Sequence, residues 1–209
     1  TRLMSSYSLD ELARRAAVLR HLGRAASISE AIRAVGGEAR ISPNLVRRHL
    51  AAMSEASFGS AEVDRQRASV LDLALDLMYA IDDHLERFTD RHPDARGCRL
   101  VGRAASGQLD CEPVLHLRVL AAMEEAELAA VVVEAGAEEP EFDLMKTREG
   151  RLRRIRTHMG GVEMHLVTCP PDLVAGEEPV NLVRPERTSL LDVVGVADLR
   201  DRILSSEPE

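Results

Sequence analysis

Residues 60–90, S-A-E-V-D-R-Q-R-A-S-V-L-D-L-A-L-D-L-M-Y-A-I-D-D-H-L-E-R-F-T-D, form a tract without glycine or proline. Its apolar residues recur at the spacing of one helix face, at Val70, Leu71, Leu73, Leu77, Met78, Ile81, Leu85 and Phe88. At about 1.5 Å per residue, one helix over this tract would span about 45 Å, more than a small domain. We therefore expect a linker and dimerisation helix over 60–91, which joins two modules in a homodimer.

Upstream of this tract, three serines stand where helices should begin. Ser8, Ser27 and Ser42 each precede an apolar periodic segment, and a serine there accepts hydrogen bonds from backbone N–H groups of the first turn. Gly23 and Gly36 follow the first two segments, and glycine is typical of the residue just past a helix. These signals predict a trihelical domain over residues 1–56.

From residue 97 on, the apolar pattern changes to short runs with two-residue alternation. They predict a hairpin, a helix and a three-stranded meander, with a basic helix over 148–158 as the alternative for the middle strand. A further strand and a closing helix complete the series, which comprises 98–104, 113–120, 121–135, 141–169, 179–183 and 188–204. The predicted fold class is α+β, with an N-terminal trihelical domain, a long linker helix, and a C-terminal antiparallel sheet with flanking helices over 97–205.

The charge of the chain is unevenly distributed. The 209 residues carry a net charge of −8, yet residues 1–56 sum to +4 and the remainder to −12. Because phosphate binding requires a basic surface, any contact with nucleic acid should be confined to the first 56 residues. The chain has two tyrosines, three phenylalanines and no tryptophan, which argues against a module that stacks bases on aromatic rings.

The composition also bears on the compartment. No apolar run reaches the roughly 18 to 20 residues of a membrane helix, and the first residues lack the pattern of a secretion signal. The three cysteines, Cys98, Cys111 and Cys169, have no C-x-x-C spacing and are interpreted as reduced thiols. We expect a cytoplasmic protein that does not associate with a membrane.

The run I-S-P-N-L-V-R-R-H-L at 41–50 resembles the recognition helix of bacterial helix-turn-helix regulators. A connection over 36–40 replaces the tighter turn of that family. The resemblance implies that the helix start faces base edges in the major groove while its apolar residues hold it to its neighbours. The implied DNA-contacting residues are Ser42, Asn44, Arg47 and Arg48.

The order of elements after residue 97 resembles the GAF- and PAS-like sensor domains of one-component transcriptional regulators, which implies a small bound ligand. In V-L-H-L-R-V-L, alternation leaves His116 and Arg118 on one face, and in G-V-E-M-H-L-V it leaves Glu163 and His165 there. If these strands are neighbours, the four side chains converge and suit an anionic metabolite. His116, His165 and Glu163 alone would suit a metal, and a solvated sheet face is the alternative.

Residues 100–119 are similar to the glycine loop and following strand of small nucleotidyltransferases. In that family the strand carries two aspartates that hold Mg²⁺. This chain has Arg103 in place of the loop serine, and Val114 and His116 in place of the aspartates, so the resemblance implies a domain without activity. No other catalytic motif occurs, and we interpret the remaining histidines as isolated residues on helices or loops, at 21, 49, 84, 92 and 158.

Together these patterns favour a ligand-responsive DNA-binding transcriptional regulator over an enzyme. DNA would be contacted through residues 1–56, and the ligand, with any cofactor, stays unidentified. The alternatives are a nucleotidyltransferase-like domain without activity, or a protein-interaction module with a helical appendage.

Overall fold

The computed structural model describes residues 7–38, 40–109, 113–147, 150–169 and 190–205. The chain is α+β, with helices in its N-terminal part and a sheet in its C-terminal part, as the sequence predicts. It divides into two compact units, of which unit 1 ends at Val63 and unit 2 begins at Asp64. We describe each unit by itself.

Unit 1 is a bundle of three helices followed by the first turn of a fourth. The three are α1 (Leu9–His21), α2 (Ile28–Ala34) and α3 (Pro43–Phe58). As predicted, each is capped by a serine whose Oγ accepts a hydrogen bond from a backbone N–H of the first turn, at 3.1–3.3 Å, from Ser8, Ser27 and Ser42. The core of the unit consists of Leu12, Ala13, Ala16, Ala17, Ala25, Ile28, Ala31, Ile32, Ile41, Val46 and Leu50.

The connection between α2 and α3 is fixed by close packing around Gly37. A Cβ atom built on Gly37 would lie 2.2 Å from Cδ1 of Ile41, so no larger residue fits while Ile41 stays buried. The Ile41 side chain thereby closes one end of the core immediately before Ser42 starts α3. Gly37 and Ile41 thus pack closely at the end of the connection that precedes α3.

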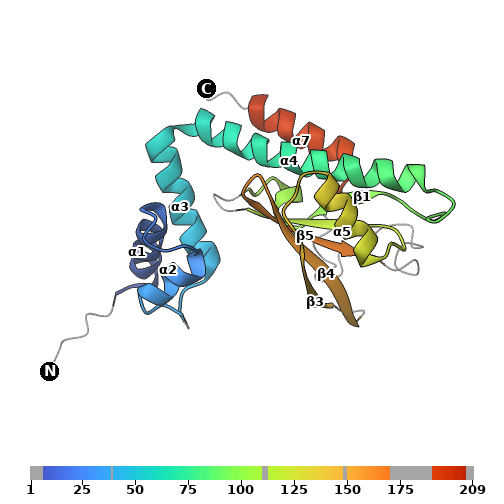
Figure 1. Cartoon of the computed structure of the whole chain (residues 1–209). Coiled ribbons are helices and arrows are strands. Elements are labelled where there is room, and N and C mark those ends of the chain that lie inside the picture. The colour runs from blue at the N-terminus through green and yellow to red at the C-terminus, as the bar shows by residue number, and fades with distance from the viewer. Residues whose placement is uncertain (1–6, 39, 110–112, 148–149, 170–189, 206–209) are drawn as a thin grey trace. The chain divides into compact units, whose positions relative to one another are not determined.

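Unit 2 is built on a mixed sheet (Figure 1). In the described part of the chain this sheet has six strands, in the order β3-β4-β5-β2-β1-β6. The strands are β1 (Cys98–Val101), β2 (Val114–Val119), β3 (Glu141–Thr147), β4 (Gly150–Met159), β5 (Val162–Thr168) and β6 (Leu190–Leu191).

The sheet was expected to be antiparallel, and four of its five strand pairs are. The exception is the pair of β2 and β5, which is parallel. The reason is the apolar content of the meander strands. Met164 and Leu166 of β5 are fully buried, whereas Phe142 and Leu144 of β3 are more than half exposed. Strand β5 therefore takes the central place beside β2, and the connection from β2 through β3 and β4 returns it in the same direction.

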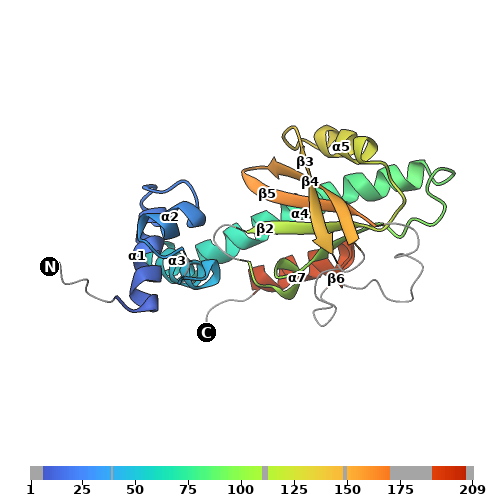
Figure 2. The ribbon, with the colours of Figure 1, turned by 90° about the horizontal axis from the view of Figure 1, so that it is seen from below.

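Three helices pack on one face of this sheet: α4 (Ser60–Arg87), α5 (Glu125–Glu134) and α7 (Val193–Ser205). In Figure 2, α4 passes behind the strands, with α5 and α7 on either side of it. Leu71, Leu77, Met78 and Ile81 of α4 are fully buried against the strands. From Asp64 on, α4 is therefore part of the core of unit 2 rather than a free linker.

Several finer expectations are settled by this arrangement. Residues 150–159 form a strand, so the alternative of a basic helix is wrong. The expected strand over 179–183 lies outside the described residues, and the two-residue strand β6 had not been predicted. None of the described helices is both long enough and apolar enough to cross a membrane.

Candidate functional site

The predicted DNA-contacting residues lie at the start of α3. Ser42, Asn44 and Arg48 are exposed, whereas Arg47 is partly buried and donates a hydrogen bond to Oδ1 of Asn44 at 3.3 Å. The opposite side of the helix carries the buried Val46. Residues 42–48 thus present an exposed polar surface on a helix that is anchored from behind.

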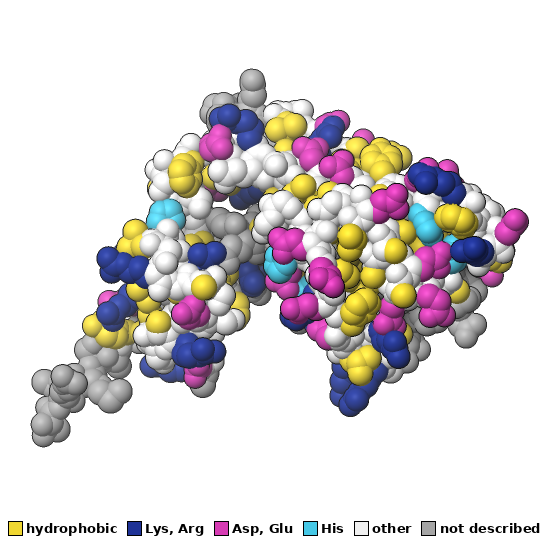
Figure 3. Space-filling model, in the orientation of Figure 1, with side chains coloured by type: hydrophobic (Ala, Val, Ile, Leu, Met, Phe, Trp, Pro, Cys, Tyr) yellow, Lys and Arg dark blue, Asp and Glu magenta, His cyan; other side chains and the backbone are white. Residues whose placement is uncertain are grey.

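Unit 1 also exposes arginines that have no acidic partner. Among the described residues, the side chains of Arg14, Arg24, Arg40 and Arg48 make no hydrogen bond or ion pair. By contrast, Arg33 pairs with Glu38 at 2.9 Å. Basic side chains are accordingly spread over the surface of unit 1 (Figure 3). Because these arginines do not pair with described acidic residues of the chain, they suit the phosphate groups of a partner.

In unit 2, the four predicted ligand-binding residues share one face of the sheet, the face opposite the helices. The parallel pairing places His116 directly opposite His165, and their ring centroids lie 5.0 Å apart. Two residues before this pair, Glu163 of β5 lies opposite Val114 of β2. Two residues after the pair, Arg118 of β2 lies opposite Val167 of β5. The expected juxtaposition therefore occurs, although the strands are parallel and not antiparallel.

Both histidines on this face are held neutral. Burial, and then the charges of His165, Arg118 and Arg154, lowers the pKa of His116 from 6.5 to about 4. Burial also lowers the pKa of His165, although the hydrogen bond to Glu163 opposes that shift. Two uncharged imidazoles therefore stand side by side at neutral pH.

Burial keeps His165 neutral, and its hydrogen bonds fix which ring nitrogen carries the hydrogen. Its Nε2–H donates to Oε1 of Glu163 at 2.8 Å, and its Nδ1 accepts from Nη1 of Arg154 at 3.4 Å. Arg154 in turn donates to Asp143 at 2.7 Å, and this bond lowers the pKa of Asp143. Each nitrogen of the ring has a partner of the complementary kind, so His165 positions its neighbours without needing a second proton.

Arg118 differs from the other arginines of this face. Arg118 is only 7% exposed, and this burial lowers the pKa of its guanidinium. Among the described residues no carboxylate lies within ion-pair distance of its guanidinium, whose one hydrogen bond to a described side chain is to Sδ of Met145 at 3.9 Å. A buried cation is costly without a counter-charge, and an anion bound beside Arg118 would supply one.

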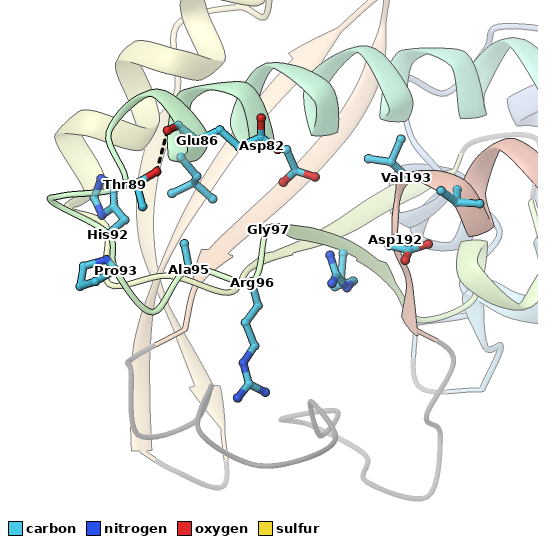
Figure 4. A pocket seen from close by; sticks show the side chains of 13 residues that line it. Asp82, Glu86, Thr89, His92, Pro93, Ala95, Arg96, Gly97, Asp192 and Val193 are labelled. Atoms are coloured by element: carbon cyan, nitrogen blue, oxygen red, sulfur yellow. Dashed lines mark hydrogen bonds between the residues drawn. The ribbon is translucent and has the colours of Figure 1, made fainter.

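A pocket of about 410 Å³ lies between the end of α4, the segment before β1 and the start of α7 (Figure 4). Its polar groups already serve the fold. Asp82 accepts a hydrogen bond from the backbone N–H of Cys98 at 2.6 Å, and Asp192 accepts one from Gly195 at 2.9 Å. Burial raises the pKa of Asp82 in spite of that bond. We therefore interpret the carboxylates of this pocket as anchors for β1 and α7.

A further cluster was missed by sequence reasoning. His84 of α4, His92 of the following loop and Glu127 of α5 place ligand atoms within 4.8 Å of one another. The interpretation of His84 and His92 as isolated residues is therefore wrong. The end of α4 lies between the two histidines, and Glu127 comes from a separate element, so only the packing of α5 against α4 brings them together. No spacing in the sequence signals such a cluster.

The positions that resemble nucleotidyltransferases carry no pair of carboxylates. Val114 and His116 stand on β2 where that family has aspartates, and His116 faces His165 across the strands. A metal held by His116, His165 and Glu163 together is also disfavoured, because among the described residues only His84, His92 and Glu127 bring three such ligand atoms within 4.8 Å of one another. Comparison with protein-family models, with curated proteins and with solved structures yields no match.

Proposed function

We propose that the chain is a DNA-binding transcriptional regulator, in which unit 1 contacts DNA and unit 2 binds a small anion. The observation that carries the proposal is the start of α3. A helix of 16 residues is anchored by Val46 and Leu50, and its exposed end presents Asn44 and Arg48. An exposed helix face fits the major groove, where the edge of adenine pairs with an asparagine amide and that of guanine with a guanidinium.

The charges of unit 1 support the same assignment. Four exposed arginines without described partners lie on α1, on the two connections and on α3, and they suit the phosphates that flank a groove. The acidic remainder of the chain would repel DNA, so contact stays within unit 1. In a homodimer, two copies of α3 would read two half-sites about one helical turn apart.

The ligand part of the proposal depends on Arg118. This buried guanidinium lacks a carboxylate partner among the described residues, and His116 beside it makes no hydrogen bond to a described residue. A carboxylate or phosphate group would neutralise the arginine and accept an N–H from the neutral imidazole. Binding there would act on the sheet that α4 covers from its other face, and α4 continues directly from unit 1.

The test measures binding of the full chain to mixed-sequence duplex DNA by fluorescence anisotropy over a series of salt concentrations. We expect affinity to fall steeply with salt, and the double variant Arg47→Ala, Arg48→Ala to bind at least about tenfold more weakly with a shallower salt slope. Arg87→Ala is the matched control, since Arg87 is an exposed arginine of unit 2 that pairs with Asp83. Absence of binding at low salt, or equal affinity of the double variant and the control, would refute the assignment.

A further inference from the structure

The cluster of His84, His92 and Glu127 contains a hydrogen-bonding conflict. Nδ1 of His92 lies 3.0 Å from the backbone carbonyl oxygen of Ala122. A carbonyl oxygen only accepts, so Nδ1 must carry the hydrogen. In the neutral ring, Nε2 of His92 is then an acceptor with a free lone pair.

That lone pair points at another acceptor. Nε2 of His92 lies 3.1 Å from Oε1 of Glu127, and Nε2 of His84 lies 2.8 Å from the same oxygen. Two imidazole nitrogens and a carboxylate oxygen therefore lie within 4.8 Å of one another, and with a neutral His92 no hydrogen stands between its Nε2 and Glu127. A cation among these atoms removes the conflict. The bond from Nδ1 to a backbone carbonyl is also the usual support of a metal-binding histidine.

From this geometry we propose that His84, His92 and Glu127 bind a zinc ion. Two nitrogens and one carboxylate oxygen form a donor set that zinc accepts, and the fourth position of the tetrahedron is left to water. Ligand atoms about 2.0–2.1 Å from a tetrahedral metal lie about 3.3 Å apart. The two nitrogen–oxygen separations would therefore open by about half an ångström or less.

The surroundings hold the ligands in place and leave access for an ion. The ring of Phe88 packs against that of His84, with centroids 4.7 Å apart, and the side chain of His92 is only 3% exposed. The side chains of His84 and Glu127 are 20% and 24% exposed, so the ion and its water would enter from their side. Magnesium and calcium prefer sites made of oxygen ligands, which argues against them here.

Zinc at this position would connect three segments of unit 2. His84 lies in the last turns of α4, His92 in the loop that leads to β1, and Glu127 in the first turn of α5. One ion would join these three segments more firmly than the packing and the contacts of His84 and His92 with Glu127 do. The proposal is independent of DNA binding, because all three ligands belong to unit 2.

The experiment uses the untagged full chain after treatment with a chelator. Zinc affinity is measured by competition with a chromogenic chelator, and cobalt serves as a spectroscopic probe of tetrahedral coordination. We expect one zinc ion per chain, a tetrahedral cobalt spectrum, and a loss of affinity of at least about tenfold in both His84→Ala and Glu127→Gln. Magnesium at the same concentration should not compete.

His158→Ala is the control, because His158 is an exposed histidine of β4 that belongs to unit 2 and is not one of the three proposed ligands. This variant should bind zinc like the wild type, and circular dichroism verifies that each variant folds. Glu127→Gln preserves the shape of the side chain and so tests the ligand without opening a cavity. The proposal is overturned if the wild type binds no zinc, if both ligand variants keep wild-type affinity, or if the control loses as much as they do.

Discussion

At the residue scale, two histidine–glutamate contacts, His165–Glu163 at 2.8 Å and His92–Glu127 at 3.1 Å, have opposite meanings. His165 donates from Nε2 to Glu163 and accepts at Nδ1 from Arg154, so its network is complete with a neutral ring. His92 uses its hydrogen on the carbonyl of Ala122 and turns a lone pair toward Glu127. Counting donors and acceptors therefore separates a structural pair from a candidate ligand set, although both have the same residue types.

The neutral state of His116 should make unit 2 sensitive to acid. The pKa of His116 in the folded chain, about 4, lies below its ordinary value of 6.5. Between these two pH values the ring is protonated in the unfolded chain but not in the folded chain. This contribution to stability is complete above about pH 6.5 and is lost as the pH falls toward about 4. The free energy of unfolding should therefore fall as the pH is lowered from about 7 to about 5. We expect this fall to be about 2 kcal/mol smaller in His116→Asn than in the wild type.

Urea unfolding of wild type and His116→Asn at the two pH values checks this prediction. His165, Arg118, Arg154 and Glu163 face the ring and stay in place in both proteins. The variant His21→Asn, at an exposed histidine of unit 1, is the control and should show the same pH dependence as the wild type. An undiminished pH dependence in His116→Asn would show that this ring is not held neutral.

The start of α3 combines a structural and a proposed binding role at the scale of the element. Ser42 Oγ caps the helix by accepting from the N–H of Leu45 at 3.3 Å, and the residue is exposed. Ser42→Ala should therefore cost about 1 kcal/mol of stability. Ser42→Asp keeps a cap and places a negative charge where DNA is proposed to lie. We expect it to preserve the melting temperature but to weaken DNA binding at least about tenfold.

Thermal melting and DNA anisotropy of the two variants separate these roles. If Ser42→Asp binds DNA as tightly as the wild type, the start of α3 does not face the duplex. If Ser42→Ala leaves the melting temperature unchanged, the cap contributes little and the helix is held by packing alone.

How far the sequence predicts each element depends on how local its cause is. Serine caps and apolar periodicity place α1, α2, α3 and α4 within a few residues, because both act within one or two turns. The convergence of His116 and His165 follows from alternation once β2 and β5 are neighbours. Which strand stands beside β2, and in which direction, depends on long-range burial, so the parallel pairing was not predicted. The cluster around Glu127 likewise depends on packing between elements.

At the scale of the whole molecule, the chain has two separate main cores. The core of unit 1 is built around Ala16, Ile32 and Leu50, whereas that of unit 2 joins α4, α5 and α7 to the sheet, and the two share no residue. The opposite charges of the two parts follow the same division. Each unit is therefore stabilised by its own hydrophobic core. Each proposed activity belongs to one unit only.

Loss of one core should consequently leave the other activity intact. Leu50→Ala removes a buried side chain from unit 1 and should cost about 2–5 kcal/mol there. We expect hydrogen exchange followed by mass spectrometry to show faster exchange in α1, α2 and α3 but unchanged protection in β2 and β5. DNA binding should weaken, while zinc binding should stay at the wild-type level. Leu117→Ala in the core of unit 2 should give the reverse pattern. If either variant loosens both units equally, the two cores unfold as one cooperative structure, and the separation of roles between them would have to be abandoned.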